Sequence, residues 1–140
     1  MERERESLDI LLIEDNPGDV YLFKSALADI GKHANVLVFA TGLAAIEHLR
    51  NITKRAAQKP DLIVLDLNLP AVNGREILKA ISDVEFLCTI PVAVFSGSFG
   101  DRSIVGEFPT LHLTYSVKTA DYDELQRIVA RFLLHAGGGK

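Results

Sequence analysis

The sequence predicts an α/β domain built on a parallel β-sheet with helices on both faces. Three observations lead to this fold class. Short segments rich in branched apolar residues alternate with longer segments whose apolar residues recur at helical spacing. This alternation of strand and helix runs five times along the chain, the pattern of a parallel sheet covered on both faces. The chain has 140 residues, which suits one domain, and no internal repeat or linker interrupts it.

The strand segments are short and nearly continuous in apolar residues. We expect the first four to be buried on both faces, because strands of parallel sheets are covered by helices on either side. The five segments are residues 8–13, 36–40, 61–67, 91–96 and 111–117.

The first three helices are expected at residues 17–31, 42–56 and 74–82, from apolar residues that follow one helical stripe. Asn16 and Pro17 mark the start of the first helix as N-cap and first-turn proline, with Asp19 in its first turn.

The last two helices differ in how well they are marked. The fourth should be short, near 101–106, because Gly106 is a poor interior residue and Pro109 bars continuation. The fifth begins at Asp121, which has capping-box spacing to Glu124. Its apolar stripe consists of Leu125, Ile128, Val129, Phe132 and Leu133.

Composition and charge argue against several classes of protein. The chain has 15 basic and 19 acidic residues, and this net charge of −4 argues against a nucleic-acid partner or an anionic membrane surface. No apolar run is long enough to span a membrane, and the charged N-terminus lacks the core of a signal peptide, so we expect a cytoplasmic protein. Residues 1–7 and 137–140 are expected to be disordered tails around a domain at 8–136.

Polar residues collect where the predicted strands end, and ligands of parallel sheets bind at those ends. These residues are Glu14 and Asp15 after the first strand, Asp66 and Asn68 at the third, Ser96 at the fourth and Lys118 after the fifth. Each alone has an ordinary structural explanation, since EDNPGD could be only a helix N-cap and Asp66 only a turn residue. Their joint placement favours a site.

The chemistry of that site follows from its carboxylates. Carboxylates held close together repel, and their pKa values rise unless a cation neutralises them. Mg²⁺ suits this set because it prefers oxygen ligands and tolerates a few carboxylates plus water. A carboxylate is also a competent nucleophile toward phosphorus, and Lys118 and Ser96 could then contact the phosphoryl group.

Four motifs, in order along the chain, make it resemble a response-regulator receiver domain over about residues 8–135. They are LLIEDNPGD, DLIVLDLNLPAVNGREIL, IPVAVFSGS and YSVK. The resemblance implies a doubly wound (βα)5, flavodoxin-like fold with strand order 2-1-3-4-5. It also implies that Asp66 accepts a phosphoryl group from a sensor histidine kinase or a phosphotransfer protein, with no enzymatic activity beyond the domain's own phosphorylation and dephosphorylation.

The resemblance also assigns roles to single residues. It implies an Mg²⁺ site formed by Glu14, Asp15, Asp66 and the backbone carbonyl of Asn68. It implies a switch that senses phosphorylation, formed by Ser96, Tyr115 and Lys118. Gly74 matches the family's turn glycine, and Gly97 matches a small position that leaves the phosphodonor access to Asp66.

Within the family, the chain looks most like stand-alone receivers paired with phytochrome-like and other hybrid sensor kinases. Because it ends after the fifth predicted helix, we expect no output domain to follow, and the signal to pass by partner docking or by a homodimer through strand five and helix five. Thr119 stands where the family usually has proline, so the Lys118–Thr119 bond should be trans. This departure and the broken fourth helix affect how the domain would pass its signal to a partner more than they affect phosphorylation of Asp66.

Two alternatives remain beside the receiver. A phosphatase of the haloacid-dehalogenase type also uses an aspartate nucleophile, but its general acid lies two residues later, where this chain has Asn68, an amide that cannot give up a proton. Its nucleophile also normally follows the first strand rather than the third. A degenerate receiver that only binds partners is the other alternative, and the intact set of site residues speaks against it.

Overall fold

The computed structural model describes residues 8–52, 59–97 and 102–137. Five parallel strands form one sheet in the order β2-β1-β3-β4-β5, which confirms the predicted fold class and strand order. The strands are β1 (Leu8–Ile13), β2 (Ala34–Phe39), β3 (Leu62–Leu65), β4 (Val92–Ser96) and β5 (Leu113–Val117).

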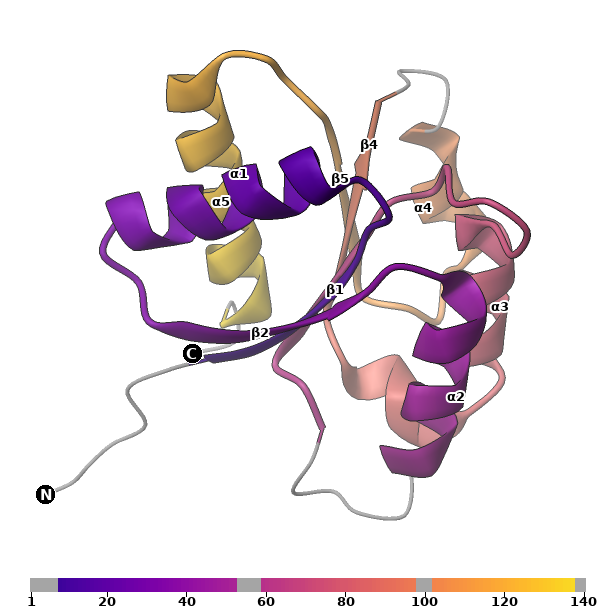
Figure 1. Cartoon of the computed structure of the whole chain (residues 1–140). Coiled ribbons are helices and arrows are strands. Elements are labelled where there is room, and N and C mark those ends of the chain that lie inside the picture. Colours follow the sequence, from indigo (N-terminus) through magenta and orange to yellow (C-terminus); the bar gives the residue numbers. More distant parts are fainter. Residues whose placement is uncertain (1–7, 53–58, 98–101, 138–140) are drawn as a thin grey trace, which may run out of the picture.

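Helices cover both faces of this sheet. Figure 1 shows α1 and α5 side by side on one face, with α2 and α3 on the opposite face. The helices are α1 (Pro17–Asp29), α2 (Gly42–Ile52), α3 (Gly74–Ser82), α4 (Ile104–Glu107) and α5 (Tyr122–Ala136). A short 3₁₀ helix, η2 (Glu85–Thr89), was not expected from the sequence.

Two apolar cores follow from the alternation of side chains along each strand. In β1, Ile10 and Leu12 belong to the core under α1 and α5, whereas Leu11 and Ile13 belong to the core under α2 and α3. β3 and β4 are buried at every position because strands pair with them on both sides and helices cover both faces.

The expectation that the first four strands are buried on both faces is wrong for β2. None of its residues is fully buried: Asn35 and Leu37 are exposed, Leu37 to 49%, and the other four are half-buried. β2 is an edge strand that pairs with β1 alone, so one of its sides lacks a neighbour. It also begins before the expected 36–40, because Ala34 already pairs with Leu8.

Helix boundaries agree with the sequence where a capping residue marks them. The Asn16 side chain accepts a hydrogen bond from the Asp19 N–H at 3.1 Å, so α1 begins as predicted. It ends at Asp29, earlier than expected, and Gly31 follows with φ +77°, a conformation that glycine adopts without strain. α3 has its predicted bounds.

Parts of two expected helices and of both tails lie outside the described residues. α4 is short, as the glycine and proline of its segment predicted, and residue 101 of the expected range is not among the described ones. Residues 53–56 of the expected second helix, and residues 1–7 and 138–140 of the expected tails, also lie outside the described residues. Gly137, which was expected to belong to the C-terminal tail, is described and is the C-cap of α5. Among the described helices, none has the length and apolar character needed to cross a membrane.

Candidate functional site

The residues predicted from the strand ends converge at the carboxyl end of the sheet. Glu14 follows β1, Asp66 follows β3, Ser96 is the last residue of β4, and Lys118 follows β5. Because β1, β3, β4 and β5 are consecutive in the sheet, these four positions are neighbours in space. The topology therefore assembles one site from four distant segments of the chain.

Backbone hydrogen bonds hold these positions in register beyond the strands themselves. The Asp66 N–H donates to the Ile13 carbonyl at 3.1 Å, which ties the end of β3 to the end of β1. The Lys118 N–H donates to the Ser96 carbonyl at 2.7 Å, which ties the end of β5 to the end of β4. The site residues are thus attached to a rigid sheet rather than to free loops.

The side chains of the site are unusually buried for polar groups. Glu14 is 5% exposed and Asp66 6% exposed, and Ser96 is fully buried. Asp66 Oδ1 accepts a hydrogen bond from the Asn68 N–H at 3.0 Å, and the Asn68 amide nitrogen lies 3.5 Å from Ser96 Oγ. Buried polar groups need such partners, because losing water without replacement is costly.

Three carboxylates form an acidic cluster that could hold a metal. Glu14, Asp15 and Asp66 each offer an oxygen atom, and these atoms all lie within 4.8 Å of one another. Glu14 and Asp66 are buried, whereas Asp15 is exposed to solvent. A set of oxygen donors alone suits a hard divalent cation such as Mg²⁺.

Lys118 is the cation that the structure places beside this cluster. Its Nζ lies 2.8 Å from Glu14 Oε1, 2.8 Å from Asp19 Oδ2 and 3.2 Å from Asp66 Oδ2. An ammonium group has three N–H donors, so the three carboxylates use all of them. The peptide bond after Lys118 is trans, as expected where no proline follows.

The pKa values of the site reflect this crowding. Burial raises the pKa of Glu14 to about 7, and the nearby charge of Asp66 adds to the effect, although the hydrogen bond from Lys118 opposes it. Burial alone would lower the pKa of Lys118, but its hydrogen bonds to Asp19 and Glu14 outweigh burial and raise it. Lys118 therefore stays charged while it contacts the carboxylates.

Asp19 is a site residue that the sequence analysis missed. It was assigned only to the first turn of α1, yet its carboxylate contacts Lys118. A signal was present in the sequence. α1 begins three residues after Glu14, so its first turn must lie at the same end of the sheet as the acidic pair.

The start of α3, just after the loop that follows β3, needs glycine at its first position. A Cβ on Gly74 would lie 2.6 Å from Leu67 Cα, closer than real atoms approach. The turn glycine inferred from the resemblance is thus explained by contact with the residue that follows Asp66. Ala71, in the loop before α3, has φ 64°, an unusual conformation for a residue with a side chain. At Gly97, a Cβ would meet no atom of the described residues within 4 Å.

Tyr115, the third residue of the predicted switch, packs on one face of the sheet. It is half-buried on β5 against the core under α2 and α3. Its ring centroid is 5.6 Å from the guanidinium carbon of Arg102, just before α4.

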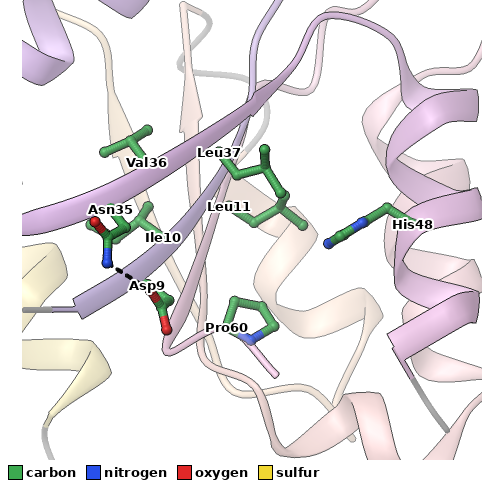
Figure 2. Close-up of a pocket in the computed structure, with 8 residues that line it drawn as sticks. All are labelled: Asp9, Ile10, Leu11, Asn35, Val36, Leu37, His48 and Pro60. Carbon is green, nitrogen blue, oxygen red and sulfur yellow. Dashed lines mark hydrogen bonds between the residues drawn. The ribbon is translucent and has the colours of Figure 1, made fainter. Parts of the chain in front are cut away.

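A separate hollow of about 430 Å³ lies between β1, β2 and α2. Figure 2 shows Leu11 and Leu37 pointing toward His48 of α2, with Pro60 below them. None of its lining residues belongs to the carboxylate site. Its lining combines apolar side chains with the polar side chains of Asp9, Asn35 and His48.

The fold is that of a receiver domain of two-component signalling, and the comparison with known families agrees. Residues 10–130 match the response regulator receiver domain, so the chain belongs to that family. Members of this family act as phosphoacceptors, which favours a receiver over the phosphatase alternative.

Individual relatives cover nearly the whole chain. The response regulator Rcp1 of Synechocystis sp. is 32% identical over 122 residues, which span 86% of this chain and 82% of Rcp1. The crystal structure of the phosphorylated cyanobacterial phytochrome response regulator RcpA superimposes with a TM-score of 0.79 at 33% identity, covering 96% of each chain.

A third similar structure bears on the metal. The receiver domain of the sensor histidine kinase PA1611 from Pseudomonas aeruginosa PAO1 has a TM-score of 0.68 at 27% identity, and the match covers 91% of this chain and 98% of that domain. That protein carries a magnesium ion coordinated in its active-site cleft.

Proposed function

We propose that this protein is a two-component response regulator in which the Asp66 carboxylate accepts a phosphoryl group from a histidine kinase or a phosphotransfer protein. The observation that carries the proposal is the position of Asp66. Its side chain is buried at the convergence of β1, β3 and β5, belongs to the acidic cluster and lies 3.2 Å from the Lys118 ammonium. A cytoplasmic location accords with this role.

The covalent step is a transfer between two nucleophiles. An Asp66 oxygen attacks phosphorus, a P–O bond forms, and the P–N bond to the donor histidine breaks with its electron pair on the nitrogen. Glu14, Asp15, Asp66 and the backbone carbonyl of Asn68 would hold Mg²⁺. A bound Mg²⁺ supplies charge neutralisation for the phosphoryl oxygens.

The residues around Asp66 then have separate roles. Lys118 keeps its positive charge and pairs with a phosphoryl oxygen, and the buried Ser96 hydroxyl donates a hydrogen bond to another. Tyr115, packed against the core under α2 and α3, completes the switch that transmits this change. Gly97 is proposed to leave a phosphodonor access to Asp66, because a glycine adds no side chain at the end of β4. No enzymatic activity beyond this phosphorylation and its reversal is part of the proposal.

The output is proposed to pass through α5 and β5. Leu125, Ile128, Val129 and Phe132 are buried against the sheet, as the stripe predicted, whereas Leu133 is only half-buried. Leu134 lies beyond this stripe and is 73% exposed. A two-fold contact between copies of this face would cover Leu134 with the same patch of its mate. The short α4 offers little ordered surface by comparison.

The assignment of Asp66 is tested by phosphorylation with acetyl phosphate and Mg²⁺, followed by mass measurement. The wild type should gain one phosphoryl mass, and Asp66→Asn should gain none, because the amide keeps the volume but is not a nucleophile. Asp123→Asn is a matched control, since it removes an exposed aspartate from the first turn of α5. Equal labelling of wild type and Asp66→Asn would falsify the assignment.

A further inference from the structure

Lys118 is held by a carboxylate outside the metal cluster. Two of its three carboxylate partners, Glu14 and Asp66, belong to the acidic cluster, but Asp19 does not. We propose that Asp19 is a positioning residue for phosphoryl transfer: it anchors the Lys118 ammonium beside Asp66. This inference rests on the proposed function and extends it by one residue.

The need for an anchor follows from the side chain of Lys118. Its ammonium group sits on a flexible stem of four carbons, and the residue follows the end of β5 rather than lying within the strand. Glu14 and Asp66 would share their oxygens with a metal in the active protein, so they are poor permanent partners for the ammonium. Asp19 is the remaining partner of the three.

Asp19 itself is held in place by α1. Its N–H donates to the Asn16 side chain at 3.1 Å, which fixes it in the first turn of the helix. The helix is anchored in turn by Phe23, which is buried in the core under α1 and α5. The carboxylate therefore approaches Lys118 from a rigid helix start, at 2.8 Å.

This arrangement separates two tasks among the donors of Lys118. Asp19 accepts one N–H of the Lys118 ammonium. A second N–H now points to Asp66 Oδ2, which lies 3.2 Å from Nζ. This second N–H can turn to an oxygen of a phosphoryl group on Asp66. The ammonium then need not leave its place when the phosphoryl group arrives. Asp19 acts through Lys118 and does not touch the reacting atoms.

The functional test compares labelling rates at saturating acetyl phosphate and Mg²⁺ for the wild type, Asp19→Asn, Lys118→Ala and the double variant. Asp19→Asn should slow labelling about tenfold, the size expected for loss of one charge-assisted hydrogen bond. In the Lys118→Ala background, Asp19→Asn should have no effect. Asp19→Glu, which keeps the charge, should recover part of the rate.

The controls distinguish loss of the Asp19–Lys118 contact from the general effect of removing one negative charge. An effect of charge alone would speed labelling by the anionic donor, and it would do so equally with and without Lys118. Asp123→Asn removes the same charge elsewhere and measures that effect separately. A rate for Asp19→Asn equal to the wild type, or an equal slowing in both backgrounds, would overturn the proposal.

A second measurement tests the contact without phosphorylation. A double-mutant cycle of unfolding free energies in EDTA should show coupling between Asp19 and Lys118, and additive effects would overturn the contact itself. A wild type that is never labelled would instead overturn the proposed function. The two failures are therefore distinguishable.

Discussion

Lys118 Nζ lies 3.2 Å from Asp66 Oδ2, although the two residues are 52 positions apart and follow strands that are separated by β4. The contact lies at the carboxyl end of the sheet. Glu14, which follows β1 on the opposite side of β3, contacts the same ammonium group. The positive charge of Lys118 thus offsets part of the negative charge of the acidic cluster. The charge balance of the site depends on Lys118 and on the carboxylates that it contacts.

Asp15→Asn should weaken Mg²⁺ binding by about tenfold or more, because it removes one of three carboxylates from the cluster. Labelling of Asp66 should fall with it. In EDTA the variant should unfold at the same temperature as wild type or higher, since one charge has left a group of like charges. Isothermal titration and thermal unfolding measure these effects, with Asp123→Asn as control. A lower unfolding temperature in EDTA would contradict the repulsion argument.

Gly74→Ala should destabilise the domain by about 1–3 kcal/mol, the usual range for a forced close contact. The Cβ of the new alanine would lie 2.6 Å from the Cα of Leu67, so the backbone next to Asp66 must shift. Labelling should slow as well. Urea unfolding measures the loss of stability.

Gly106→Ala is the matched control for that substitution. Within the part of the chain that the structure describes, nothing lies within 4 Å of the Cβ position, and the residue is inside α4. Alanine there should stabilise the domain by about 0.5–1 kcal/mol, because glycine is a poor helix former. If both variants lose stability equally, the contact with Leu67 is not the cause.

Acid should weaken the domain through His135, whose ring stacks on His112 with centroids 4.1 Å apart. Burial lowers the pKa of His135, and the hydrogen bond to the His112 carbonyl offsets this only in part. The unfolded chain therefore binds the proton more readily than the folded one, so stability is present above about pH 6.5 and is lost as the pH falls below it.

The measurement is the unfolding free energy between pH 5 and pH 8 for wild type and His135→Gln. The raised pKa of Glu14 acts with the opposite sign, because the folded state binds its proton more readily, so the difference between the two proteins isolates His135. His135→Gln should lose less stability on acidification than wild type. A pH profile unchanged in His135→Gln would refute the prediction.

Leu134→Asp should shift the protein to monomer while changing the stability of the monomer little, because this side chain is 73% exposed. Sedimentation at several concentrations, with and without beryllofluoride, measures the association. Leu43→Asp, a 57% exposed leucine at the start of α2, should leave association unchanged. A wild type that is monomeric under both conditions would rule out the dimer and leave α5 as a face for another protein.

The sequence by itself determined the elements that depend on neighbours along the chain. α3 has its predicted bounds, and α1 starts at its predicted cap, because capping and periodicity are local. The positions of Glu14, Asp66, Ser96 and Lys118 at strand ends were also predictable, since parallel strands end at one side of a sheet.

Only the tertiary structure decided which groups these residues contact. β2 looked like an interior strand from its composition, but it is exposed because strand order leaves it at the edge. Asp19 looked like a helix-end charge, yet the packing of α1 beside the end of β5 makes it a partner of Lys118. A long side chain has many rotamers of similar energy, so its place is set by the carboxylates that the fold brings within reach, and those come from segments far apart in the sequence.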